Sequence, residues 1–456
     1  MLKERQTDYL SRKQNGLRLF CFSLFLIFIS GRTLAQVTTF TFPLSPLATK
    51  TLVDSLANQI NKYYVIKDAA LKMSSYLRKR FKDGAYNKIS DPHILAGKLT
   101  TDVLSVQKDE HFHVEYNPQL ANEVLGNIED VPKMVAEKLN EERSKNFGFK
   151  KAEILNGNIG YLEISSFSRL NAYSKATANA ALAFVSNARA LIIDLRYGVG
   201  GSPDMVNHIV SHFFRTSTHV ADIYIRCENA TLPYWTVPDS SFGPLTTIPI
   251  YILTSYKTFS AAEGLAYQLQ SLKRATLVGE VTRGGAHTVS YKALSSGFIS
   301  DIPFGRSIDP ISKKNWEGTG IVPDITVTAE NALEAAELKI FENALSSAED
   351  SVDIRKIKWQ MDLMQARNHP IAVDTATLKK YVGNFGAFAL TYLEGKLYYQ
   401  KTGKARFPLI PMSNTMLRPK GNDTFTLELF KNESGRVVRL VTYYDDGRRE
   451  YADRTP

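Results

Sequence analysis

Residues 190–201 read ALIIDLRYGVGG, a short apolar run that passes directly into a glycine-rich turn. Apolar runs of this length are typical of strands that are buried on both faces of a parallel sheet. The same rhythm of short strands and helical patterns extends over residues 158–164, 172–188, 205–214 and 248–254, then over a helix from Ser260 and a strand at 275–279. Such alternation predicts an α/β core, which we place at residues 147–330.

The segment before this core has a helical pattern. Apolar side chains recur at helical spacing through residues 46–108, as in Leu52, Leu56 and Ile60. We therefore predict an N-terminal helical domain over residues 36–120. Its last part, residues 109–116 (DEHFHVEY), alternates like a strand.

The segment after the core divides into two parts. Residues 331–370 are charged and helical in pattern, which predicts a closing helix and a linker. Residues 371–456 contain alternating runs such as FTLELF at 425–430 and a hairpin pattern around Glu394-Gly395. They predict a separate small all-β module.

The N-terminus has the three-part layout of a secretory signal peptide. Basic residues are scattered over 1–18, the apolar run LFCFSLFLIFIS occupies 19–30, and the small-x-small pattern TLA precedes Gln36. The apolar run is shorter than the about 20 residues that span a bilayer. We expect residues 1–35 to be removed, leaving an extracytoplasmic protein, periplasmic or secreted, with no stable membrane span.

The net charge is less informative than it looks. The chain of 456 residues has a formal charge of +10, which would suit a nucleic-acid partner. Six of its 56 basic and two of its 46 acidic residues lie in residues 1–35, so the remaining chain carries +6 without a long basic block. Nucleic-acid binding is therefore not expected. With two Cys in all, a disulfide framework and a Cys-rich zinc site are excluded, and we expect no metal or cofactor.

Two motifs could carry chemistry. Residues 258–263 (TFSAAE) place Ser260 between a strand and a helix, where free N–H groups and the helix dipole favour a developing oxyanion. The same residues also fit a capping box, with Ser260 as cap and Glu263 reaching back. The glycine turn 198–201 could bring N–H groups close to a ligand, or could be only a tight strand-to-helix connection. Each motif alone leaves its role open.

Taken together, the motifs resemble those of peptidase family S41, which includes C-terminal processing proteases, interphotoreceptor retinoid-binding protein repeats and the tricorn core protease. The family pattern has a strand ending in D-L-R, a Gly triplet, T-x-S-A-A-E and a closing motif. In this chain the corresponding stretches are residues 191–201, 258–263, 275–285 (ATLVGEVTRGG) and 317–324 (EGTGIVPD). The order and spacing agree across 147–330, and the helical segment before it fits the family's N-terminal domain.

The resemblance implies a fold and a reaction. It implies a crotonase-like α/β spiral core and an exported serine endopeptidase that cleaves peptide or protein substrates through an acyl-enzyme. Ser260 would be the nucleophile. The backbone N–H groups of Gly200, Gly201 and Ala261 would form the oxyanion hole.

The family has two ways to activate the serine. One branch uses a Lys in T-x-G-K-G, but the matching residues 282–286 are TRGGA, with Gly285 at the Lys position. The other branch, similar to the tricorn core protease, uses Ser, His and Glu, with the His in a D-x-H motif. The resemblance therefore implies His111 as general base and Glu317 as the group that orients it.

Two other histidines stay open as candidates. If residues 109–116 form a strand, His113 lies on the same side as His111 and could be the base. His287 lies near the position of the missing Lys and could contact substrate or serve as the base.

The glycine turn departs from the family's usual R-x-N-G-G-G, because Gly198 replaces the Asn and Val199 replaces the first Gly. If that position requires a positive φ, Val suits it poorly. An alternative function follows, in which the chain is a catalytically silent binding protein for peptides or apolar ligands. The distance from Ser260 Oγ to a histidine nitrogen distinguishes the two functions.

Overall fold

The computed structural model describes residues 42–126, 131–239, 243 and 245–455. The predicted signal peptide, residues 1–35, lies outside this part of the chain. Within the described part, none of the helices combines the length and the apolar character needed to cross a membrane.

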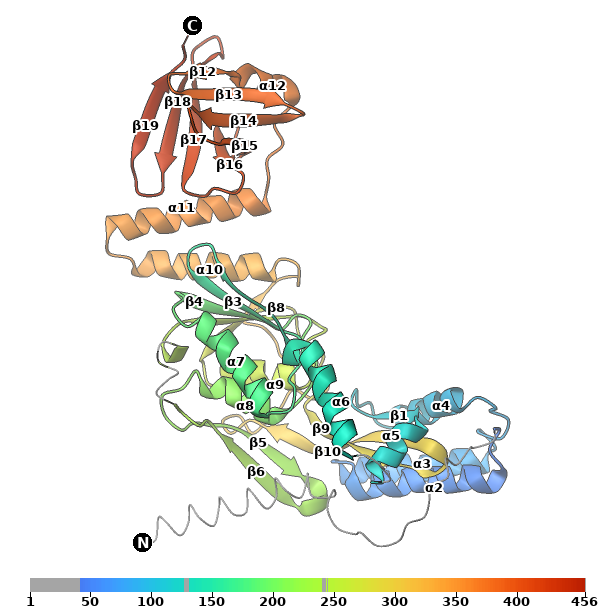
Figure 1. Ribbon diagram of the computed structural model, residues 1–456. Coiled ribbons are helices and arrows are strands. Elements are labelled where there is room, and N and C mark those ends of the chain that lie inside the picture. The colour runs from blue at the N-terminus through green and yellow to red at the C-terminus, as the bar shows by residue number, and fades with distance from the viewer. Residues whose placement is uncertain (1–41, 127–130, 240–242, 244, 456) are drawn as a thin grey trace, which may run out of the picture.

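A six-stranded sheet forms the centre of the chain, in the order β11-β8-β7-β4-β3-β2 (Figure 1). Its strands are β2 (Phe149–Leu155), β3 (Ile159–Ile164), β4 (Ala190–Asp194), β7 (Ile250–Thr254), β8 (Ala275–Gly279) and β11 (Ile325–Thr326). The pairs from β3 to β11 are parallel, and β2 runs antiparallel to β3. Every residue of β4 and β7 is buried, as expected for the apolar runs that predicted these strands.

Helices cover both faces of this sheet. One layer consists of α7 (Ala172–Phe184), α8 (Pro203–Ser211) and α9 (Ala261–Ser271), and the other of α10 (Ala332–Ser347) and α11 (Ser351–Asn368). Along β4, Leu191 and Ile193 pack into the first layer and Ile192 into the second. This arrangement confirms the predicted α/β core.

A second sheet joins the N-terminal region to the core. It has the order β1-β10-β5-β6, with β9 paired to β10, and all its pairs are antiparallel. Its strands are β1 (His113–Tyr116), β5 (His219–Ile225), β6 (Ala230–Trp235), β9 (His287–Ala293) and β10 (Phe298–Ile308). Short 3₁₀ turns connect elements at η1 (Asn146–Gly148), η2 (Arg226–Glu228) and η4 (Ser295–Gly297). The predicted N-terminal domain and core therefore share one sheet.

The N-terminal region is helical, as predicted. It contains α2 (Pro46–Tyr63), α3 (Lys67–Lys82), α4 (Pro92–Leu104), α5 (Pro118–Val124) and α6 (Val131–Ser144). Asp91 caps α4 by accepting the N–H groups of His93 and Ile94. The apolar stripe of α2 packs in a cluster that also contains Phe298 and Ile302 of β10. Helix packing thus holds β1 and the turn before it against the core.

One predicted element, the strand over residues 109–116, is correct only in its second half. Residues 109–112 form a turn rather than a strand, and β1 begins only at His113. The Asp109 carboxylate accepts the His111 N–H and closes this turn. The alternation rule for strands therefore does not place His111 and His113 on one side.

The C-terminal module is an eight-stranded antiparallel sheet preceded by α12 (Thr375–Tyr381). The strands are β12 (Gly383–Phe385), β13 (Phe388–Leu393), β14 (Lys396–Lys401), β15 (Arg406–Pro411), β16 (Met416–Pro419), β17 (Phe425–Lys431), β18 (Val437–Tyr444) and β19 (Arg449–Asp453). They pair in chain order, and a bridge between Phe385 and Arg454 nearly closes the sheet. In Figure 1, α10 and α11 lie between this module and the central sheet.

Candidate active site

Ser260 occupies a tight turn between the end of β7 and the start of α9. Its φ is +56° and its ψ is −118°, a conformation that costs a non-glycine residue of order 1–3 kcal/mol. Hydrogen bonds hold the turn on both sides. The Ser260 N–H donates to Glu263 at 2.8 Å, and the Ser260 carbonyl accepts from Gly264 at 2.9 Å.

Glu263 anchors this turn to the loop after β8. Its carboxylate is fully buried and accepts four hydrogen bonds of 2.6 to 2.8 Å, from the N–H groups of Ser260, Gly284 and Gly285 and from the Thr282 hydroxyl. Burial raises the pKa of Glu263, and these four donors oppose that rise. The sequence indicated only a helix cap, whereas the structure shows a carboxylate that joins the Ser260 turn to residues 282–285 through four hydrogen bonds.

The glycine turn after β4 lies against Ser260. The Phe259 N–H donates to the Gly198 carbonyl at 3.0 Å. A Cβ on Gly200 would lie 3.1 Å from Ser260 Oγ, a tight contact, so glycine suits the close approach of the two turns. The two motifs that are far apart in the sequence therefore meet in one place.

Val199 is accommodated in this turn without strain. It does not have a positive φ, and its side chain is exposed. The position that demands glycine is Gly201, whose φ is +151° and where a Cβ would lie 2.1 Å from the Phe167 carbonyl oxygen. The departure from the family pattern thus falls where the backbone tolerates it.

Gly200, Gly201 and Ala261 line the cavity beside Ser260. No described residue accepts a hydrogen bond from their backbone N–H groups. Ala261 is the first residue of α9, where an N–H has no partner within the helix. Free amides at such a place suit an oxygen that carries negative charge.

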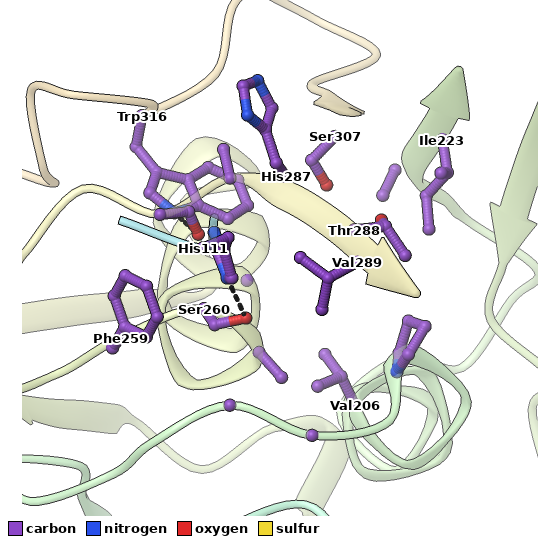
Figure 2. Close-up of a pocket in the computed structure, with 18 of the residues that line it drawn as sticks. His111, Val206, Ile223, Phe259, Ser260, His287, Thr288, Val289, Ser307 and Trp316 are labelled. Atoms are coloured by element: carbon purple, nitrogen blue, oxygen red, sulfur yellow. Dashed lines mark hydrogen bonds between the residues drawn. The ribbon is translucent and has the colours of Figure 1, made fainter. Parts of the chain in front are cut away.

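His111 meets Ser260 from the N-terminal region (Figure 2). Its Nε2 lies 2.9 Å from Ser260 Oγ, within reach for proton transfer. Its ring stacks on Phe259 with the ring centroids 4.5 Å apart. Burial lowers the pKa of His111 to about 4, although the nearby Asp109 charge acts to raise it. The imidazole is therefore neutral at neutral pH and able to accept a proton.

Asp109 connects His111 to the rest of the site. One carboxylate oxygen accepts the His111 N–H at 3.0 Å, and the other accepts the Tyr64 hydroxyl at 3.0 Å and lies 2.8 Å from His287 Nδ1. Burial acts to raise the pKa of Asp109, but the hydrogen bonds from His287, His111 and Tyr64 hold it below its ordinary value. Asp109 is thus a buried carboxylate that fixes the His111 turn.

The structure corrects the contact expected of Glu317. Its Oε2 accepts the Ala286 N–H at 2.6 Å and lies 3.6 Å from His287 Nδ1. His111 Nδ1, the atom that an orienting carboxylate would contact, is buried and has no hydrogen-bond partner among the described residues. Because Ala286 and His287 engage the carboxylate, Glu317 lies beside the other histidine and makes no direct bond to His111.

The two alternative histidines differ in position. His113 lies exposed on β1 opposite Asp301 and does not line the cavity. His287 lines the cavity at the start of β9, but its Nδ1 is engaged by Asp109. Of the histidines in the described part of the chain, His111 is the one that hydrogen-bonds Ser260.

Asp109, His287 and Glu317 also form a group that could hold a metal ion. One ligand atom from each lies within 4.8 Å of the others, and one nitrogen with two carboxylate oxygens is a donor set that zinc accepts. The hydrogen bonds from Tyr64 and His287 to Asp109 account for the same arrangement without an ion. The geometry alone therefore does not require a metal.

The cavity beside Ser260 has a volume of about 400 Å³. Its walls come from α8, α9, β5 and β9, together with the glycine turn. Among the residues that the structure describes, no Asp, Glu, Lys or Arg lines it. The cavity therefore offers a mostly apolar surface next to Ser260 and His111, with room for part of a peptide.

Comparisons with known proteins identify the family of this chain. The model of peptidase family S41 matches residues 158–327, and that of the N-terminal domain of peptidase S41 in eukaryotic IRBP matches residues 47–147. Together the two models span more than half of the chain. The chain belongs to peptidase family S41.

Relatives of this S41 chain are distant. The chain is 29% identical over 167 residues to carboxyl-terminal-processing peptidase 2, chloroplastic, of Arabidopsis thaliana, which is 36% of this chain and 31% of the relative. The chain therefore matches less than a third of that relative's length. A lipoprotein from Streptococcus agalactiae has a TM-score of 0.44 at 15% identity over 67% of this chain and 99% of its own. The photosystem II D1 C-terminal processing protease has a TM-score of 0.40 at 15% identity over 62% and 94%.

The lysine that one branch of the family uses would not fit at position 285 of this chain. A Cβ on Gly285 would lie 2.6 Å from His111 Cε1 and 2.3 Å from the Phe259 ring. A side chain at position 285 and the observed place of His111 therefore exclude each other.

Sequence reasoning missed two residues of this S41 site. The Trp316 indole N–H donates to the Gly285 carbonyl at 3.0 Å and so fixes the loop beside His111. Its place directly before Glu317 could have indicated it. Tyr64 donates to Asp109 across 45 positions of the chain, and no local pattern marks such a contact.

Proposed function

We propose that this protein is an exported serine endopeptidase that hydrolyses peptide bonds through an acyl-enzyme. The observation that carries the proposal is the 2.9 Å distance from His111 Nε2 to Ser260 Oγ at the N-terminus of α9. A hydroxyl and a neutral imidazole at this distance are the parts of an activated nucleophile.

Each side chain then has a defined task. Ser260 Oγ attacks the scissile carbonyl carbon while His111 Nε2 takes the hydroxyl proton. The N–H groups of Gly200, Gly201 and Ala261 stabilise the oxyanion, and one such donor is typically worth about 3–4 kcal/mol of barrier. His111 next gives the proton to the leaving amine, and water hydrolyses the acyl-enzyme by the same route in reverse.

The charge that forms on His111 is balanced through space. Asp109 is close enough to act on the pKa of His111, and it stays a carboxylate because three groups donate to it. Glu317 supports the same cluster through His287 and the Ala286 N–H. We therefore assign Asp109 and Glu317 to positioning and electrostatic roles, with Ser260 and His111 at the reacting atoms.

The alternative of a silent binding protein loses its main support. That reading depended on Val199 distorting the glycine turn, and Val199 does not have a positive φ. The Ser260–His111 distance also falls in the range that favours an enzyme.

A covalent probe tests the proposal. A small alkyl fluorophosphonate should label the full chain at Ser260, and mass spectrometry of the labelled peptide locates the adduct. Ser260→Ala should abolish labelling, whereas Ser346→Ala, at an exposed end of α10, should leave it unchanged. Folded protein that resists the probe, or that is labelled elsewhere, would overturn the assignment.

Export is proposed on the sequence alone. The basic, apolar and small-x-small segments of residues 1–35 support it. Expression with fractionation, followed by N-terminal sequencing of the extracytoplasmic protein, should give a chain that starts at Gln36. Full-length protein retained in the cytoplasm would contradict export without bearing on Ser260.

A further inference from the structure

The cavity extends away from Ser260 along α9. Ser260, Gly264 and Gln268 are spaced by four residues, so they lie on one face of the helix, and all three line the cavity. At 1.5 Å per residue, Gln268 lies about 12 Å from Ser260 along the helix axis. A Cβ on Gly264 would meet only Trp316, at 3.8 Å, so the passage between the two ends is open.

The walls of this passage are apolar. Val206 of α8, Ile223 of β5 and Val289 of β9 line it. In Figure 2, Ser260 Oγ points toward the side on which Val289 and Val206 lie. Burying a charged group without a partner is costly, and no Asp, Glu, Lys or Arg lines the cavity. The passage is therefore suited to an uncharged side chain with a long apolar body.

The far end carries one unsatisfied polar atom. Gln268 Oε1 is buried and has no hydrogen-bond partner among the described residues. A buried acceptor left without a donor typically costs about 1–3 kcal/mol. Gln268 itself lines the cavity, so a turn of its unpartnered amide would present this oxygen to a bound group.

We propose that this passage is the side-chain pocket for the residue that supplies the scissile carbonyl, and that it selects tyrosine. The aromatic ring would lie between Val206, Ile223 and Val289. The phenol hydroxyl would donate to Gln268 Oε1 once the amide turns toward the cavity. A site built to receive a hydroxyl discriminates strongly against the analogue that lacks it, because its own polar group is then left unpaired. The inference rests on the proposed peptidase function.

The test compares peptides that differ only in the residue before the scissile bond, with Tyr, Phe, Leu or Lys there. We expect kcat/KM for Tyr to exceed that for Phe by about ten-fold or more, and the Lys peptide to be the poorest. In Gln268→Leu the Tyr-to-Phe ratio should fall to about one, with cleavage of the Phe peptide retained.

A matched variant controls for the loss of a buried amide. Gln360 of α11 also has a buried Oε1 without a partner, but it does not line the cavity, so Gln360→Leu should leave the Tyr-to-Phe ratio unchanged. The inference is overturned if peptides are cleaved with no preference for Tyr, or if the preference survives Gln268→Leu. It is also overturned if the preference for Tyr applies only to the residue after the scissile bond. The proposed function itself would fail differently, with no peptide cleaved and no fluorophosphonate on Ser260.

Discussion

His111 is held in place without a carboxylate on its second ring nitrogen. The Phe259 ring stacks on one face, Asp109 fixes the His111 backbone, and Gly285 leaves the space that the ring fills. These three contacts restrict the ring as a hydrogen bond to Nδ1 would. The negative charge of Asp109 acts on the imidazole through space, so the electrostatic and the orienting tasks are divided between different contacts.

The pH dependence of Ser260 acylation should report this environment. His111 must be neutral to act as base, and its pKa of about 4 lies below the ordinary 6.5. We therefore expect the rate of fluorophosphonate labelling to be half-maximal near pH 4 and flat above pH 6. The same shift means that the unfolded chain binds a proton between pH 6.5 and 4 that the folded chain does not, so the stability from His111 declines as the pH falls through this window. A labelling midpoint near 6.5 would contradict the buried position of His111.

Gly285 should be the residue least able to accept a side chain. In Gly285→Ala the new Cβ meets His111 and Phe259 at under 3 Å, so the imidazole must move from Ser260. We expect labelling to slow by at least about ten-fold, which corresponds to 1.4 kcal/mol, while the circular dichroism spectrum is unchanged. Gly97→Ala is the matched control, because nothing lies within 4 Å of a Cβ on that helical residue. Equal labelling of the two variants would refute the steric argument.

At the scale of elements, the sequence predicts what local periodicity determines. The strands β4 and β7 were predictable because every residue in them is buried, and α4 because Asp91 and Pro92 mark its start. The turn at residues 109–112 was not predictable, because alternating residue types cannot distinguish a strand from a turn closed by the Asp109 side chain. The Ser260 and His111 pair was expected from the family resemblance, whereas the partners of Glu317 depend on how loops pack, which no local pattern encodes.

The glycine turn supports a prediction about two positions of the motif, 199 and 201. Val199→Gly should change stability and labelling little, because Val199 is exposed and its backbone needs no glycine. Gly201→Ala should be severe, because it adds a Cβ 2.1 Å from the Phe167 carbonyl at a φ of +151°. We expect a loss of stability of at least about 1–3 kcal/mol from the backbone alone, measured by urea unfolding, and loss of labelling. If Val199→Gly were instead strongly activating, the family's first Gly would matter for a reason other than φ.

At the scale of the whole molecule, the hydrogen-bonded pair of Ser260 and His111 is assembled from two segments. Ser260 belongs to the central α/β layers, whereas His111 arrives with the N-terminal helices. Pairing of β1 with β10 and the contact of the Asp109 carboxylate with His287 Nδ1 at 2.8 Å join the two segments. Helix packing in the N-terminal region is therefore a condition of the geometry at Ser260, because it determines where the turn before β1 lies.

The C-terminal module, by contrast, should be dispensable for acylation. Its hydrophobic cluster draws only on residues 373–452 of the described chain. Its hydrogen bonds to the rest include one from the Trp359 indole N–H to the Asp423 carbonyl at 3.0 Å and one from the Asn156 amide to the Asp423 carboxylate at 2.9 Å. A chain that ends at residue 370 should therefore keep its labelling rate at Ser260 within about two-fold. For each 1 kcal/mol of unfolding free energy that the truncation removes from the core, Tm should fall by about 2–4 °C.

A chain that ends at residue 330 is the informative comparison for this truncation. It lacks α10 and α11, and with them Ala336, Ile340 and Phe341, which fill the second face of the central sheet. It should fail to fold cooperatively in a thermal melt, because the apolar residues of β4 and β7 on that face would be exposed to water. If the chain that ends at residue 370 melts cooperatively but is not labelled, the β module must contribute to the site, because the core would be intact and only the module would be missing.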